Sequence, residues 1–169
     1  MKAPARLLVL LAVAVSSCSS AASWPTDEVR ELEKANSFEL YSLEPLADPD
    51  TYEQDYDPNG PGERLYGWRI LGKTTVSDEL TRRELVDALK EGMNKGEPLK
   101  CFRPRHALRR TNNGKPVDLL ICFECSQVAL YRDGKQVGSY KSVARSVQST
   151  FDEALTKAGV PLAKKKQHP

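Results

Sequence analysis

The sequence predicts an α+β domain: an antiparallel sheet of four or five strands with two main helices packed on one face. Three observations predict this class: short runs of alternating apolar and polar residues, two hairpin-type turns, and two segments with apolar residues at helical spacing. A mean hydropathy of -0.51 and a hydrophobic content of 40% suit a globular domain and exclude a multi-pass membrane protein.

The first elements are a short helix and two strands. Thr26 is the expected N-cap of the helix, and two acidic residues follow it in the first turn. The alternation of residues 38–43 predicts a strand, and residues 65–71 predict a second one that continues to Val76. Residues 44–62, rich in proline and acidic residues, form the loop between them.

The clearest helix spans residues 77–94. Its apolar residues recur every four positions, as on the buried face of an amphipathic helix. Thr81 and Glu84 are expected to form a capping box, with Leu80 as the hydrophobic staple. Gly96 ends the helix.

An antiparallel meander should follow, with strands at residues 105–110, 117–131 and 137–142. Its turns are Asn112-Asn113-Gly114 and Asp133-Gly134, because these residue types accept a positive φ.

The last helix begins near Ser149. Gly159 occupies the position just after its C-terminus, where Val160 can make the accompanying hydrophobic contact.

The N-terminus has the form of an export signal. Lys2 and Arg6 precede an unbroken apolar run, Leu7–Val15, which is too short to span a bilayer as a helix. The next residues, Val15-Ser16-Ser17-Cys18, resemble the bacterial lipobox, although Ser16 and Ser17 replace the commoner Ala and Gly. The resemblance implies cleavage before Cys18, a diacylglycerol group on its thiol and, with Ser19 next, sorting to the outer membrane in Gram-negative bacteria.

An ordinary secretory signal cut after Ala21-Ala22-Ser23 is the alternative, and it would make the protein secreted or periplasmic. On the lipobox interpretation, residues 1–17 are the signal peptide and residues 18–36 are a lipid-anchored tether with a short helix. Residues 37–163 then form a single α+β domain, and residues 164–169 form a basic tail.

Charge argues against a nucleic-acid partner. The chain has 25 Lys and Arg against 23 Asp and Glu, and Lys2 and Arg6 in the signal segment account for the difference. Nucleic-acid-binding domains usually carry a strong basic excess.

Three cysteines and one histidine are the candidate chemical groups of the domain. Cys101, His106, Cys122 and Cys125 follow the pattern C-x4-H-x15-C-x2-C, which approximates a Cys₃His zinc site. The C-x2-C half is a recognised zinc half-site, whereas C-x4-H is not a common partner spacing.

The hairpin register decides whether His106 meets Cys122. With Asn113-Gly114 as the whole loop, His106 faces Ile121; one further loop residue would place it opposite Cys122. Cys101 lies near Cys125 in both registers.

Three interpretations of these residues therefore stay open. Cys101 forms a disulfide with Cys125 or Cys122; or all four residues bind zinc; or a cysteine is a redox or nucleophilic thiol with His106 as its base. The third is the least favoured, because a C-x2-C thiol of the thioredoxin type starts a helix and this one continues as strand.

Two charged segments are candidate binding surfaces. Arg103, Arg105, Arg109 and Arg110 form an anion-patch candidate, although charges on a solvated edge hairpin explain them more simply. The acidic run of residues 48–57 lacks the EF-hand order of calcium ligands and is expected to be a solvated loop.

No P-loop, GxGxxG, GxSxG or HExxH motif occurs in the sequence. The expectation is a lipid-anchored envelope protein acting as a non-enzymatic binding or accessory module, without a cofactor. Its partners would be the membrane, through the lipid, and an envelope protein. A zinc-binding or thiol protein is the alternative.

Overall fold

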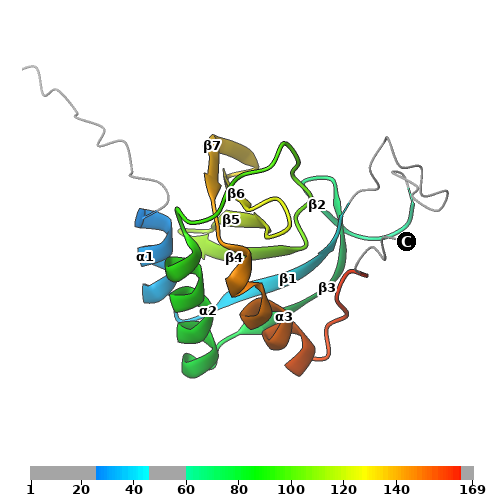
Figure 1. Cartoon of the computed structure of the whole chain (residues 1–169). Coiled ribbons are helices and arrows are strands. Elements are labelled where there is room, and N and C mark those ends of the chain that lie inside the picture. Colours follow the sequence, from blue (N-terminus) through cyan, green and yellow to red (C-terminus); the bar gives the residue numbers. More distant parts are fainter. Residues whose placement is uncertain (1–25, 46–59, 165–169) are drawn as a thin grey trace, which may run out of the picture.

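The sheet has seven antiparallel strands in the order β2-β3-β1-β4-β5-β6-β7 (Figure 1). The computed structural model describes residues 26–45 and 60–164, so the signal segment, Cys18, the acidic run and the basic tail after Lys164 lie outside the described residues. The elements are α1 (Thr26–Lys34), β1 (Phe38–Glu44), β2 (Arg64–Leu65), β3 (Trp68–Val76), α2 (Glu79–Gly92), β4 (His106–Asn112), β5 (Lys115–Cys122), β6 (Gln127–Arg132), β7 (Lys135–Ser142), the 3₁₀ turn η1 (Arg145–Val147) and α3 (Gln148–Lys157).

The α+β class and the antiparallel sheet are confirmed, but the predicted count of four or five strands is wrong. Two predicted strands each contain a chain reversal. Tyr66 and Gly67, with φ of 53° and 89°, separate β2 from β3. A turn before Ser126, whose φ is 52°, separates β5 from β6. Neither reversal contains Asn-Gly or Asp-Gly, so the sequence pattern predicts one continuous strand across each of them.

Both predicted meander turns are confirmed. Asn113 and Gly114 have φ of 49° and 77°, and Asp133 and Gly134 have φ of 50° and 80°. These positive values at both central positions are those of the hairpin turn that matches strand twist. The first turn has the two-residue loop, so His106 pairs with Ile121.

The helix termini agree in part with the prediction. The N-cap of α2 is Asp78, whose carboxylate accepts the backbone N–H of Thr81 at 2.9 Å, so the predicted capping box at Thr81 is wrong. Leu80 is 70% exposed and therefore is not a staple. The end of α3 is confirmed, since Val160 N–H donates to Leu155 O at 2.9 Å and Gly159 has a φ of 71°.

All three helices pack on one face of the curled sheet (Figure 1). Their apolar residues and those of the sheet form one core, in which Leu40, Leu85, Ile121, Phe151 and Leu155 are fully buried. The first helix, α1, belongs to this core because Val29 and Leu32 are buried in it. The domain therefore includes part of the segment predicted as tether.

A buried ion pair fixes α1 to the sheet. Glu28 of α1 is buried and accepts hydrogen bonds from Arg110 of β4 at 3.0 Å and from the Nε of Arg132 of β6 at 3.0 Å. Because a buried carboxylate needs compensating charge, these contacts select one position for a short helix.

The opposite face of the sheet carries a second, smaller core. Tyr41, Leu43, Leu65, Ala107 and Leu120 are buried there, and half-buried aromatic side chains surround them. No helix covers this face among residues 26–45 and 60–164.

Candidate functional site

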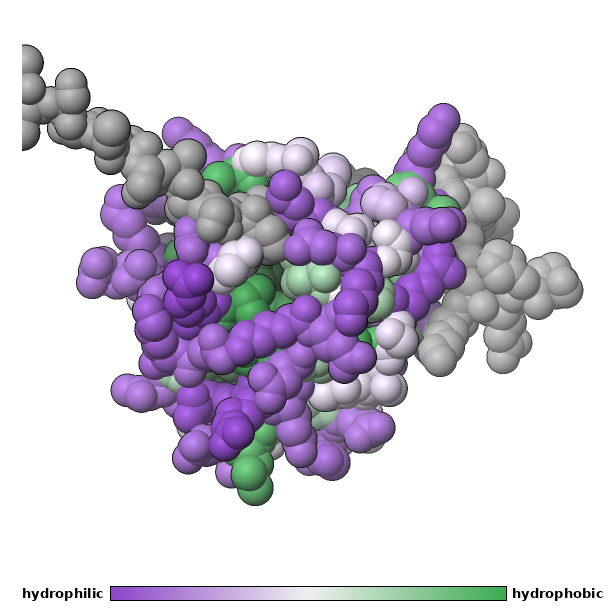
Figure 2. Space-filling view, turned by 60° about the vertical axis from the view of Figure 1, so that its left-hand side comes forward, coloured by the Kyte–Doolittle hydropathy of each residue, from purple (hydrophilic) through white to green (hydrophobic). Residues whose placement is uncertain are grey.

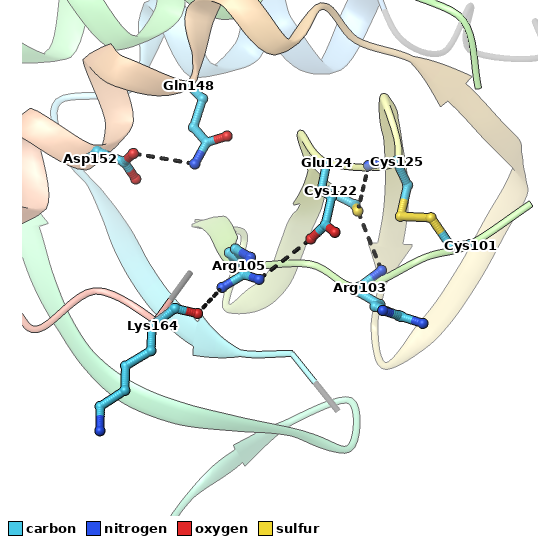
Figure 3. Close-up of polar contacts among 9 residues, drawn as sticks. All are labelled: Cys101, Arg103, Arg105, Cys122, Glu124, Cys125, Gln148, Asp152 and Lys164. Atoms are coloured by element: carbon cyan, nitrogen blue, oxygen red, sulfur yellow. Dashed lines mark hydrogen bonds and ion pairs between the residues drawn. A yellow bond between two sulfur atoms is a disulfide. The ribbon is translucent and has the colours of Figure 1, made fainter. Parts of the chain in front are cut away.

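A disulfide joins the loop before β4 to the turn between β5 and β6. Cys101 and Cys125 are bonded, with their Cα atoms 5.7 Å apart (Figure 3). Backbone and side-chain contacts reinforce the junction, since Leu99 N–H donates to Cys125 O at 3.0 Å and Gln127 Nε2 donates to Leu99 O at 2.9 Å. Of the two pairings predicted for Cys101, the structure contains the one with Cys125.

Cys122 is a buried free thiol beside this disulfide. Its Sγ accepts the backbone N–H of Cys125 at 3.1 Å and that of Arg103 at 3.3 Å (Figure 3). Burial raises the pKa of the Cys122 thiol, and the two N–H donors oppose that rise. The turn of residues 123–126 is thus held by a sulfur that replaces a backbone acceptor.

His106 lies away from Cys122, on the face of the sheet that the helices cover. Its cross-strand partner is Ile121, and neighbouring residues of a strand point to opposite faces, so Cys122 points the other way. His106 Nε2 lies 2.8 Å from Asp152 Oδ1 of α3, and the rings of Phe123 and Phe151 meet it edge-on. This arrangement does not favour His106 as a base for Cys122.

Ser42 lies opposite His106, which contacts Asp152, but the three side chains do not form a hydrogen-bonded triad. Ser42 pairs directly with His106 across β1 and β4. Ser42 Oγ and His106 Nδ1 are both buried and have no hydrogen-bond partner among the described residues. Ser42 is 1% exposed and His106 is 2% exposed, so a substrate has no path to either side chain in this conformation.

The four predicted zinc ligands are used separately. Two are bonded to each other, Cys122 accepts two N–H groups, and His106 contacts Asp152. Within the described ranges, no group of three or more His, Cys, Asp or Glu side chains gathers as a metal site. The zinc hypothesis stays a prediction that metal analysis would test.

The arginine candidates are spread over both faces of the hairpin. Arg109 and Arg110 are neighbours in β4 and pair with carboxylates on opposite sides of the sheet, Asp118 and Glu28 respectively. Arg105 contacts Glu124 Oε2 at 3.4 Å and donates to the backbone O of Lys164 at 2.8 Å (Figure 3). These contacts do not assemble a single anion-binding surface.

Sequence reasoning missed a buried polar network on the helix-free face. Asp118 is fully buried and accepts hydrogen bonds from Arg109 at 2.6 and 3.0 Å and from the hydroxyl of Tyr66 at 2.5 Å. Burial and the bond to Asp118 raise the pKa of Tyr66 well above its ordinary value. The two-residue hairpin register places Arg109 opposite Asp118. Applying that register to the charged residues of the hairpin would therefore have found this ion pair.

Aromatic side chains line the same face. Tyr66 stacks on Tyr131 with ring centroids 4.0 Å apart. Phe102 lies between Trp68, at 6.4 Å, and Tyr140, at 4.6 Å. Tyr140 is 42% exposed and the other four are half-buried, so part of each ring is accessible to a partner.

A groove lies between α1 and α2. Its volume is about 320 Å³, and it is lined by Leu32, Glu33, Glu79, Arg82, Arg83, Val86 and Asp87. Figure 2 shows this side of the molecule as a mainly hydrophilic surface with apolar patches between charged side chains. The lining mixes both signs of charge and does not indicate one class of ligand.

Comparison with known protein families, with curated proteins and with solved structures gives no significant match. None of the helices in residues 26–45 and 60–164 has the length and apolar character needed to cross a membrane.

Proposed function

We propose that this protein is an exported, lipid-anchored envelope protein whose α+β domain acts as a non-enzymatic binding or accessory module. The observation that carries the proposal is the Cys101–Cys125 disulfide, because such bonds persist in oxidising compartments outside the cytoplasm. The lipobox-like residues ending at Cys18 supply a delivery signal that agrees with that compartment.

The helix-free face supports a binding role. Aromatic residues that offer both apolar area and polar groups are enriched at protein interfaces. Tyr66, Trp68, Tyr131 and Tyr140 present such area on one face, together with Phe102 and beside the Arg109–Asp118 pair. A partner protein in the envelope is the occupant that this chemistry favours.

The burial of the reactive side chains supports a non-enzymatic role. His106 and Cys122 are at most 2% exposed, and burial keeps the Cys122 thiol protonated near neutral pH. A substrate would have to open the core or the cysteine loop to reach either group. Turnover by the purified protein that Cys122→Ala or His106→Ala abolishes would contradict this part of the proposal.

Lipid attachment is tested by metabolic labelling with an alkyne fatty acid in a Gram-negative host. The full chain should take up the label and fractionate with membranes, and Cys18→Ser should lose the label. Cys122→Ser is the matched control and should keep it, since its cysteine lies inside the domain. An unlabelled full chain, or a label that survives Cys18→Ser, would overturn the anchor.

The binding face is tested by a photo-crosslinking residue placed at Tyr140 or at Leu80. Both positions are exposed, at 42% and 70%, but Leu80 lies on α2, on the helical side of the sheet. In intact envelopes, position 140 should give a discrete adduct that Trp68→Ala removes, and position 80 should not give it. Equal adducts from both positions would contradict a role for this face.

A further inference from the structure

The free thiol and the disulfide form one cluster of three sulfurs. Figure 3 shows the side chain of Cys122 beside the Cys101–Cys125 disulfide. The hydrogen bond from Cys125 N–H to Cys122 Sγ, at 3.1 Å, keeps Cys122 next to the disulfide. Thiol–disulfide exchange requires a thiol close to a disulfide sulfur, and this contact supplies that proximity.

We propose that Cys122 and the Cys101–Cys125 disulfide form an internal exchange site that releases Cys101 as a reactive surface thiol. The Cys122 thiol gives up its proton, its sulfur bonds to Cys125 Sγ, and the Cys101–Cys125 bond breaks. The electron pair of that bond leaves with Cys101 Sγ, which takes up a proton. One disulfide forms and one breaks, so the step needs no external oxidant or reductant.

The local geometry suits the product as well as the reactant. Cys122 and Cys125 are three residues apart at the chain reversal between β5 and β6, and the backbone N of Cys125 lies 3.1 Å from Cys122 Sγ. The backbone N–H groups of Arg103 and Cys125 point at Cys122 Sγ and would stabilise the attacking thiolate.

The leaving cysteine is the most accessible of the three. Cys101 is half-buried, whereas Cys122 and Cys125 are fully buried. The hydrogen bonds of Leu99 to Cys125 and Gln127 hold the loop of Cys101 beside the turn when the disulfide breaks. The released Cys101 thiol is therefore partly accessible to solvent and stays close enough to Cys125 to return.

Charged groups around the thiol set the rate of the exchange. Burial raises the pKa of Cys122, Glu124 in the turn raises it further, and Arg105 before β4 lowers it. Exchange should therefore be slow at neutral pH and should accelerate as the thiolate fraction rises with pH. The released Cys101 thiol would react with disulfides and other electrophiles that reach the surface of the protein.

Alkylation of the native, oxidised full chain with excess iodoacetamide tests the proposal, because trypsin separates the two states. Cleavage after Lys100 and Arg105 releases peptide 101–105, and peptide 111–132 contains both Cys122 and Cys125. The starting disulfide links these two peptides. The exchanged form gives an alkylated peptide 101–105 and an internal bond within peptide 111–132.

We expect Cys101 to be alkylated at a rate that does not depend on the iodoacetamide concentration. The internal bond between Cys122 and Cys125 should form at the same rate. Cys122→Ala should keep the two peptides linked and lower Cys101 alkylation roughly tenfold or more. Alkylation of Cys122 with the peptides still linked, or no alkylation of either cysteine, would overturn the proposal.

A second variant tests the product directly. Cys101→Ser leaves Cys122 and Cys125 as the only domain cysteines, and mild oxidation with glutathione disulfide should join them within peptide 111–132. Circular dichroism checks that the variant is folded. A folded variant that keeps two free thiols under these conditions would also overturn the proposal, because the exchanged bond could not form.

Discussion

Loss of the Cys101–Cys125 bond should destabilise the domain by an amount that follows from the length of chain it closes. The two cysteines are 24 residues apart in sequence. Closing a loop of this length removes about 12 cal/mol/K from the entropy of the unfolded chain, which is about 3.4 kcal/mol near room temperature. Domains of this size have a free energy of unfolding of about 5–15 kcal/mol, so the bond supplies a large share of it.

Urea unfolding followed by far-ultraviolet circular dichroism measures this contribution. With an m value of about 2 kcal/mol/M, Cys101→Ala/Cys125→Ala should lower the midpoint of the full chain by about 1.7 M. A non-thiol reductant should shift the unsubstituted chain and Cys122→Ala similarly, and should not shift the double variant. A double variant that unfolds within about 0.3 M of the oxidised chain would refute a large contribution from this bond.

Three further predictions concern buried polar groups. Glu28→Gln should lower the free energy of unfolding by about 3 kcal/mol, because it leaves the charge of the buried Arg110 unpaired. Glu33→Gln, on the exposed side of α1, should lower it by less than about 1 kcal/mol. Equal urea midpoints for the two variants would contradict this. Asp152→Ala should lower the free energy of unfolding by about 1–3 kcal/mol, because it leaves the His106 ring without a hydrogen bond. Asp152→Asn should recover most of this loss. An Asp152→Asn variant as unstable as Asp152→Ala would exclude the hydrogen bond as the cause. Above about pH 8.5 stability should fall as pH rises, because burial raises the folded-state pKa of Cys122 and the unfolded chain loses its thiol proton first. The slope from this group is at most about 1.4 kcal/mol per pH unit, and Cys122→Ala should remove it; an unchanged slope between about pH 8.5 and pH 9.5 would contradict the assignment.

The parts of the fold that the sequence predicts are those with strong local signals. Asn113-Gly114 and Asp133-Gly134 carry residue types that tolerate a positive φ, and both turns form as expected. The end of α3 is equally local, since Gly159 and Val160 make the C-terminal motif with the last turn of their own helix.

The missed reversals depend on contacts between distant residues. Tyr66 takes a left-handed conformation while its hydroxyl bonds to Asp118, which is 52 residues away in sequence. The turn before Ser126 is held by the Cys122 sulfur and by the disulfide to Cys101. Neither contact is visible in a window of neighbouring residues, so tertiary structure overrides the strand pattern.

The sequence predicts that Cys101 and Cys125 lie close together, but not that they are bonded to each other. Either hairpin register brings Cys101 near Cys125, and the structure has them bonded. The register also decides which residue His106 faces. The two-residue loop at Asn113-Gly114 places His106 opposite Ile121 and away from Cys122. Its contact with Asp152 comes from the packing of α3 on the sheet, which one sequence does not specify.

Peptide mass mapping of the chain isolated from cell envelopes tests export and the disulfide in one measurement. After alkylation and digestion, we expect an N-terminal peptide that begins at an acylated Cys18. We also expect peptides 101–105 and 111–132 either joined by a disulfide or carrying the exchanged internal bond. An N-terminus at Met1 together with three free domain thiols would contradict both export and the disulfide-stabilised fold on which the proposed function rests.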